Sequence, residues 1–290
     1  MFDHHRHFCG SIPVETIIKL LRSRISIDML KERIVITEPV SFKEFLQRFE
    51  LFDYVSWDEF NLKFAFQSAV DDVEKDPDLE GASFICSVDK YRLKPAHCFD
   101  LFNDVKKNSS KKIGLILGIK YEKCDEFVNN YDSYKECFKF IDGVNFISKE
   151  NQMKRKIIEM IINKLKDYNI QIGMHVGEMG GNENVQFAID AGVNIISHGT
   201  KANDDTVRKA LGHGILIDVS LVSNLLTSVI RNPSEHGFFN YLDNPNVRLV
   251  SDDPVIFNNT VSKEIELYHN AIKSPILRCV PDYPHPGYYA

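Results

Sequence analysis

The strongest constraint on the fold is a set of short apolar segments that recur along the whole chain. They lie at residues 1–7, 82–88, 113–119, 143–147, 170–175, 193–198, 214–219 and 247–251. Residues 1–7 would form the first strand, and the other seven segments are short and mostly apolar, which is typical of strands buried on both faces. Strands of this kind occur in parallel sheets that are covered by helices.

Helical patterns separate these segments. Residues 153–168 place apolar side chains at positions 157, 158, 161, 162 and 165, which form one stripe of a helix. Residues 184–190 and 204–211 precede the next strands in the same way. Alternating strands and helices predict a parallel sheet, and eight such units predict a TIM (β/α)8 barrel. A doubly wound open sheet is the alternative, although no G-x-G-x-x-G motif follows any strand.

The 290 residues fit one barrel domain over residues 1–290, with an unusually long first crossover. Residues 41–76 predict two or three helices inserted after the first strand. This insertion is rich in phenylalanine, with Phe42, Phe45, Phe49, Phe52, Phe60, Phe64 and Phe66. It either packs outside the barrel or covers its top and excludes water. Several prolines predict an irregular tail over residues 280–290.

Charge and cysteine content narrow the class of protein. The formal net charge of −6 disfavours nucleic acid as a partner and suits a small-molecule substrate better. The six cysteines are scattered without a C-x-x-C pair, which argues against a cysteine zinc site or a disulfide framework. With no signal-peptide pattern and no apolar run of membrane-spanning length, we expect a cytoplasmic protein without a membrane partner. Homo-oligomerisation is left open.

Histidines and an acid gather at predicted strand ends. His5 and His7 are two residues apart, so on a strand both face the same side. His175 ends the fifth apolar segment, and Asp252 follows the last one. The carboxyl ends of barrel strands meet at the active-site face. An H-x-H pair alone could be accidental, but three histidines and one carboxylate make a complete set of zinc ligands.

Further polar residues at the same strand ends predict acid–base chemistry. Glu178 lies just beyond the strand that His175 ends, where burial could keep its carboxyl group protonated as a proton donor. His198 ends the next strand, and Asp253 follows Asp252. Each has an ordinary alternative: an acid at a helix N-terminus, a core histidine, or acids in a solvated turn. Their recurrence at several strand ends favours a catalytic site.

Four ordered motifs resemble those of the adenosine and AMP deaminase branch of the amidohydrolases. They are H-R-H-F-C-G-S at residues 5–11, H-V-G-E at 175–178, S-H-G at 197–199 and S-D-D-P at 251–254. The helices of the first crossover are also similar to the insertion of that family. The resemblance implies one zinc ion per chain, bound by His5, His7, His175 and Asp252.

The resemblance also implies catalytic roles. The zinc ion would lower the pKa of its bound water toward ~7. His198 would support the resulting hydroxide, and Asp252 would take up a proton during the attack. Glu178 would protonate the ring nitrogen beside the attacked carbon, and Asp253 would hydrogen-bond the heterocycle.

The expected substrate contacts depart from the family pattern. Cys9 stands where adenosine deaminases carry an Asp that contacts the ribose, and a thiol is a poor hydrogen-bond partner. Ser148 ends a segment where the family has a purine-contacting glycine. Residues 220–224 keep only the Ser-Asn end of the family's C-P-T-S-N. We therefore expect Asp253, Cys9 and Ser148 to contact a substrate other than adenosine.

The leading function is hydrolytic deamination of a purine nucleoside, a purine base or a related amino-heterocycle, with release of ammonia. One alternative is hydrolysis of an amide or ester bond by the same metal centre. Another is a non-catalytic binding protein on the same scaffold, which the intact set of polar groups disfavours. Cytidine-deaminase chemistry is excluded because its P-C-x-x-C motif is absent.

Overall fold

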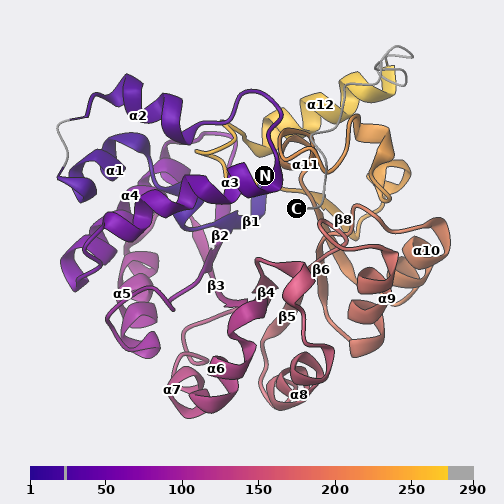
Figure 1. Cartoon of the computed structure of the whole chain (residues 1–290), viewed down its shortest axis with the longest axis horizontal. Helices are drawn as coiled ribbons and strands as arrows, with labels where there is room; N and C mark the ends of the chain where they lie inside the picture. The colour runs from indigo at the N-terminus through magenta and orange to yellow at the C-terminus, as the bar shows by residue number, and fades with distance from the viewer. Residues whose placement is uncertain (23–24, 274–290) are drawn as a thin grey trace.

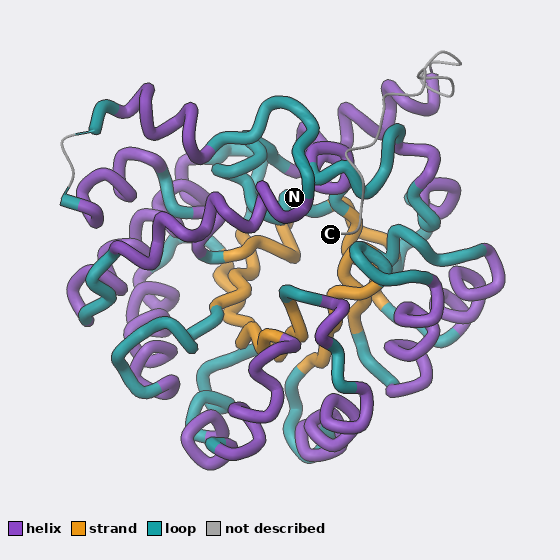
Figure 2. Tube along the Cα trace, viewed as in Figure 1, coloured by secondary structure: helices purple, strands orange, loops and turns teal. Residues whose placement is uncertain are grey.

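Eight parallel strands surround a common axis in the computed structural model, which describes residues 1–22 and 25–273 (Figures 1 and 2). Neighbours in the sheet follow the order of the chain from β1 to β8. The strands are β1 (Phe2–His7), β2 (Gly81–Cys86), β3 (Lys112–Lys120), β4 (Gly143–Ile147), β5 (Gln171–Val176), β6 (Ile195–His198), β7 (Leu216–Val219) and β8 (Val247–Leu249). All eight predicted strands are confirmed.

The segment after β8 closes the ring against β1. The amide of Asp252 donates to the carbonyl of His5 at 3.1 Å, and the amide of His7 donates to the carbonyl of Asp252 at 2.8 Å. A parallel bridge between Arg6 and Asp252 accompanies these bonds. The predicted TIM barrel is therefore confirmed, and the open-sheet alternative is excluded. The closure also fixes Asp252 beside both histidines of β1.

Helices follow the strands on the outside of the barrel, and the last one, α12, comes after β8 (Figure 1). They are α5 (Pro95–Asn108), α6 (Cys124–Asn129), α7 (Tyr131–Lys135), α8 (Arg155–Leu165), α9 (Asn182–Ala191), α10 (Asp204–Gly212), α11 (Leu221–Leu226) and α12 (Val261–Lys273). Short 3-10 turns occur at η1 (Cys9–Ser11), η2 (Arg48–Tyr54), η3 (Tyr121–Lys123), η4 (Glu150–Gln152), η5 (Pro233–Glu235) and η6 (Phe239–Tyr241). In α8 the predicted stripe is buried at Ile158, Ile161, Ile162 and Leu165.

The first crossover forms a helical insertion, as predicted, but starts earlier than residue 41. Its helices are α1 (Val14–Leu21), α2 (Ile27–Ile34), α3 (Phe42–Gln47) and α4 (Glu59–Lys75). A capping box between Ser41 and Glu44 starts α3. The pattern of residues 14–34 is short and broken by the segment between α1 and α2, so it was not recognised as helical from the sequence.

Backbone and ring contacts attach the insertion to loops at the carboxyl ends of the strands. The amide of Ile36 donates to the carbonyl of Ile256 at 2.7 Å, and that of Val40 donates to Leu226 at 2.8 Å. The Phe45 ring stacks on Phe257 with centroids 5.1 Å apart. These partners follow β7 and β8. The buried phenylalanines of the insertion, such as Phe45, therefore serve packing, whereas Phe60 is exposed. The segment between α2 and α3 also braces the loops on the face that carries the candidate site.

The hydrophobic core lies inside the barrel wall and between the wall and the helices. Phe8, Phe66, Phe84 and Phe102 form one aromatic cluster where β1 and β2 meet α4 and α5. Within residues 1–22 and 25–273, no helix combines the length and apolar character needed to cross a bilayer. The tail predicted to be irregular, residues 280–290, lies outside the described residues.

Candidate metal centre and its acid–base groups

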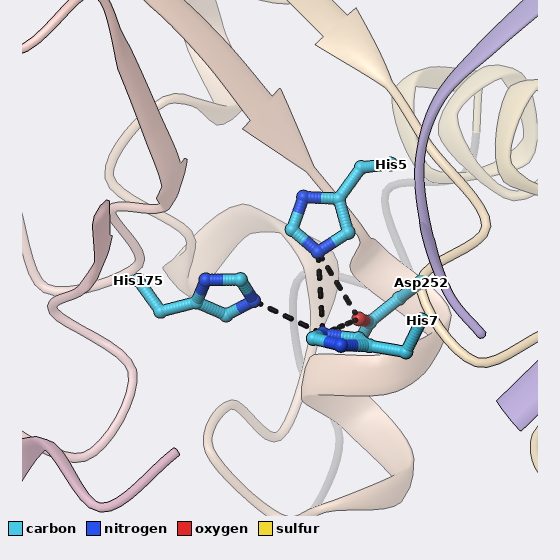
Figure 3. Close-up of side chains that lie close together, drawn as sticks. All are labelled: His5, His7, His175 and Asp252. Atoms are coloured by element: carbon cyan, nitrogen blue, oxygen red, sulfur yellow. Dashed lines mark hydrogen bonds and ion pairs between the residues drawn. The ribbon is translucent and has the colours of Figure 1, made fainter. Parts of the chain in front are cut away.

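Strands β1, β5 and β8 bring four donor groups together at their carboxyl ends. His5 and His7 come from β1, His175 from β5, and Asp252 from the residues just beyond β8 (Figure 3). The Nε2 atom of His7 lies 3.4 Å from that of His5 and 3.1 Å from that of His175. Oδ1 of Asp252 lies 3.5 Å from Nε2 of His5 and 3.3 Å from Nε2 of His7. The four ligand atoms all lie within 4.8 Å of one another.

These residues fit a divalent metal ion. Ligand atoms placed tetrahedrally at about 2.0–2.1 Å from one zinc ion lie about 3.3 Å apart, close to the separations seen here. Oδ1 of Asp252 is buried and has no hydrogen-bond partner among the described residues. An unpaired buried carboxylate oxygen facing two imidazole nitrogens is unfavourable without a cation between them. Three imidazoles with one carboxylate also form a donor set that suits zinc.

Neighbouring polar residues orient the imidazoles. Nδ1 of His175 lies 3.0 Å from Oδ1 of Asn145, whose amide in turn donates to Ser197 at 3.1 Å. A proton on Nδ1 of His175 then leaves Nε2 free for a metal ion. Nδ1 of His5 faces Oδ2 of Asp218 at 3.6 Å. Neither Asn145 nor Asp218 was predicted to orient a histidine, although each is a polar residue within an apolar strand.

Asp218 is itself held by Arg248 of the next strand. Nε of Arg248 donates to Oδ1 of Asp218 at 2.8 Å. Asp218 and Arg248 are direct partners in the register between β7 and β8. Burial opposes ionisation of Asp218, but Arg248 and His5 together lower the pKa of its carboxyl group. The carboxylate that faces His5 is therefore ionised and fixed in place.

Several residues at the strand ends adopt the left-handed backbone conformation that favours glycine. Ser148, His198 and Asp252 have φ angles of 77°, 66° and 65°. They follow or end β4, β6 and β8. Such conformations cost of order 1–3 kcal/mol each and cluster at functional sites.

Glu178 and His198 lie side by side, next to the four candidate metal ligands. Oε2 of Glu178 is 3.7 Å from Nε2 of His198, and both side chains are largely buried. Nδ2 of Asn224 lies 3.3 Å from Nδ1 of His198 and 3.5 Å from Oε1 of Glu178. Thr200 donates to Oδ1 of Asn224 at 3.1 Å. Because Oδ1 of Asn224 accepts from Thr200, its amide group donates to His198, which places the proton of the neutral imidazole on Nε2.

Burial and neighbouring charges set the protonation states of this group. Burial raises the pKa of Glu178 well above its usual range, and the carboxylates of Asp252, Glu150 and Asp253 raise it further. Burial lowers the pKa of His198 to about 4. At neutral pH the pair therefore consists of a carboxylic acid and a neutral imidazole. The Glu178 proton is available for donation to a bound molecule.

The remaining predicted contacts lie around the same mouth. A Cβ atom on Gly10 would lie 1.8 Å from Oδ1 of Asp253, so only glycine allows this carboxyl group its position. Burial raises the pKa of Asp253 well above its usual range. Burial also raises the pKa of the Cys9 thiol to about 11, which keeps it neutral. The hydroxyl of Ser148 donates to Glu122 at 3.1 Å.

A family model described as adenosine deaminase matches residues 1–274. The chain belongs to the adenosine deaminase family. The resemblance inferred from the four motifs is thereby confirmed. Within the family, the chain is similar to proteins with more than one named activity.

Curated relatives include adenine and adenosine deaminases. The chain is 33% identical to an adenine deaminase of Chelativorans sp. over 34% of this chain and 32% of that protein. It is 24% identical to an adenosine deaminase of Streptococcus thermophilus over 94% of this chain and 86% of the relative. The match to an adenine deaminase of Sinorhizobium medicae also covers less than half, 42%, of that relative's length.

Solved structures share the fold at low identity. The adenine deaminase of Arthrobacter aurescens superposes with a TM-score of 0.81 at 17% identity, covering 94% of this chain and 88% of its own. The Arabidopsis N6-mAMP deaminase gives 0.81 at 17% identity, covering 94% and 87%. An amidohydrolase from Burkholderia ambifaria, solved with bound zinc, gives 0.78 at 19% identity, covering 95% and 81%.

Proposed function

We propose that this protein is a zinc-dependent aminohydrolase that replaces the amino group of a purine or related amino-heterocycle with oxygen and releases ammonia. The observation that carries the proposal is the buried carboxyl group of Glu178, whose pKa burial raises, beside a cluster of three histidines and one aspartate. A carboxylic acid at this place can protonate a ring nitrogen. Amide or ester hydrolysis by the same cluster would have no need of a ring-nitrogen donor.

The proposed zinc ligands are His5, His7, His175 and Asp252. A zinc ion bound there supplies Lewis acidity, which makes water acidic enough to act as a nucleophile near neutral pH. Burial opposes protonation of His7, but Asp253 and Asp252 outweigh it and raise the pKa of the imidazole. A proton on Nε2 of His7 would compete with the metal ion for that nitrogen. Metal binding is therefore expected to weaken as the pH falls.

The chain's own residues would move the protons of the reaction. Water oxygen forms a bond to the carbon that bears the amino group, while Glu178 donates its proton to the adjacent ring nitrogen. The ionised Asp252 accepts a proton from the attacking water, and the neutral His198 supports the nucleophile electrostatically. The bond to the amino group then breaks, and the amino group leaves as ammonia with that electron pair and the proton that Asp252 took up. The hydroxyl oxygen forms a carbonyl double bond as its proton returns to Glu178, and the ring nitrogen keeps the proton it received.

The groups that face the substrate favour a base without a tightly held ribose. Asp253 is buried, and Oδ1 has no hydrogen-bond partner among the described residues, so it can bind a heterocycle nitrogen. Cys9 is a neutral thiol where an aspartate would bind a sugar hydroxyl more strongly. We therefore propose that free purine bases or other amino-heterocycles are better substrates than adenosine. The proposed partners do not include nucleic acid or a membrane.

Ammonia release from a panel of substrates tests this function. Zinc-loaded protein would be incubated with aminopurines, nucleosides, nucleotides and pterins, and ammonia measured together with the change in ultraviolet absorbance. We expect turnover of at least one amino-heterocycle. Turnover of amides or esters without any ammonia from the panel would favour the hydrolase alternative. Binding without turnover of any compound would favour a binding protein.

A further inference from the structure

Glu150 is a buried carboxylate with an unusual set of donors. It begins η4, just beyond β4, and is 3% exposed. Its oxygens accept hydrogen bonds from the amides of Gly177 at 2.7 Å, Met179 at 2.9 Å and Gly180 at 2.7 Å. The side-chain amide of Asn184 donates a fourth at 2.9 Å. No motif of the sequence analysis included this residue.

The three amides belong to the loop that carries Glu178. Gly177 precedes Glu178 and Met179 follows it, so the two hydrogen bonds hold the backbone on both sides. Gly177 has a φ of 69°, which fixes a sharp exit from β5. A Cβ atom on Gly180 would lie 2.6 Å from Oε1 of Glu150. The loop therefore requires glycine where its backbone approaches this carboxylate.

We propose that Glu150 is a positioning residue that holds the proposed proton donor, Glu178, next to His198 and the metal cluster. The inference rests on the proposed function for the role of Glu178, whereas the hold on the loop follows from the hydrogen bonds alone. Glu150 makes no contact with the predicted metal ligands. It acts on the reaction only through the backbone and through its negative charge.

The charge of Glu150 adds a second effect. The titratable groups that face Glu178 are Asp252, Asp253 and Glu150, which favour its protonated form, together with the neutral His198 and the buried phenol of Tyr121. Removing one of these carboxylates would lower the pKa of Glu178. A looser loop would also admit water to Glu178, and this hydration would lower the pKa of Glu178 further. A substitution at Glu150 should therefore shift the pKa of Glu178. A substitution at a purely structural residue elsewhere should leave that pKa unchanged.

The variant Glu150→Gln keeps the size of the side chain but replaces an acceptor oxygen by a donor amide. That amide would face other donors, so at least one loop hydrogen bond is lost. A misplacement of about 1 Å can cost about 10²-fold in rate. We expect kcat on the best substrate to fall by about that factor, with KM and zinc content little changed. Normal kcat in zinc-loaded Glu150→Gln would overturn the proposal.

A measurement without substrate separates this inference from the proposed function. Infrared titration of zinc-loaded protein would follow the carboxylic acid band that Glu178→Gln removes. In Glu150→Gln this band should disappear at lower pH than in the wild-type protein. An unshifted band would overturn the proposal. If the wild-type protein deaminates no compound, the proposed function fails, but the band still decides whether Glu150 controls Glu178.

Glu264 provides a matched control. It is fully buried in α12 and accepts hydrogen bonds from Ser220 and from the amides of Leu221 and Val222 at the start of α11. Glu264→Gln should lower thermal stability about as much as Glu150→Gln but should shift the Glu178 band less, because Glu264 reaches Glu178 only through Asn224 of α11. An equal shift of the band in both variants would show a general loss of packing and would overturn the specific role of Glu150.

Discussion

Nε2 of His198 lies 3.7 Å from Oε2 of Glu178, and the two side chains have opposite pKa shifts. Burial raises the pKa of Glu178 and lowers that of His198 to about 4, so neither group is charged at neutral pH. Neither uncharged group would compete with the proposed metal ligands for a cation. The arrangement leaves a proton on the acid, where a substrate ring nitrogen could receive it.

Glu178→Gln tests the proton donor. Glutamine keeps the shape of the side chain but has no carboxylic proton, and Glu178 is not among the proposed ligands. General acid catalysis is typically worth about 10²–10⁴-fold, so kcat should fall by at least about two decades. KM and zinc content should change much less. Near-normal turnover with zinc retained would assign the donor role to another acid, such as Asp253.

The next prediction concerns the metal content of the purified protein. Gently purified protein should contain about one zinc ion per chain by elemental analysis, because the cluster offers one complete set of ligands. The variant His175→Ala should lose both zinc and activity, because it removes the proposed ligand from β5. Chelation should abolish activity, and added zinc should restore it. A protein that stays fully active without metal would contradict this prediction.

The pH dependence follows from the raised pKa of Glu178. Glu178 acts as a donor only when protonated, so kcat should hold through neutral pH and fall as the pH rises through its shifted value. The neighbours that determine the pKa of Glu178, and so the pH of this decline, are Asp252, Glu150, Asp253 and His198. The residual activity of Glu178→Gln, measured over the same range, should lack that alkaline decline. An unchanged decline in the variant would mean that another group controls it.

Asn224 should affect catalysis through His198. Asn224→Ala removes the amide that donates to Nδ1 of His198, which leaves the imidazole free to adopt the other tautomer. We expect kcat to fall about tenfold to a hundredfold with zinc retained, on the scale of other residues that orient active-site histidines. Thr200→Val removes only the donor to Oδ1 of Asn224 and should have a smaller effect. Equal rates in Asn224→Ala and the wild type would contradict the orienting role.

Substrate preference can be tested with matched compounds. Adenosine should be a poor substrate compared with another amino-heterocycle, because a neutral thiol at Cys9 binds sugar hydroxyls weakly. The measurement is kcat/KM for adenine, adenosine and AMP under identical zinc loading. A value near ~10⁶ M⁻¹s⁻¹ for adenosine, as expected of a well-matched enzyme, would refute the prediction.

Local sequence patterns predicted much of the fold and the positions of the candidate metal ligands. The apolar segments set the eight strands, because burial on both faces demands near-continuous hydrophobic runs. His5 and His7 share a strand face, and His175 ends another strand, so their convergence follows from the barrel topology. The strand ends were predicted to within a few residues. The short helices α1 and α2 were missed because brief amphipathic patterns are ambiguous.

The tertiary structure decided how the site works. Asn145 and Asp218 meet their histidines across the sheet, where the register decides which polar atoms meet. Asn224 reaches His198 from α11, a contact that only the packing of that helix sets. Glu150 reaches the Glu178 loop from a neighbouring unit of the barrel for the same reason. The protonation of Glu178 depends on desolvation and on charges contributed by several separate segments. Sequence spacing carries periodicity, but it does not carry distances between segments or the exclusion of water, which together set these pKa values.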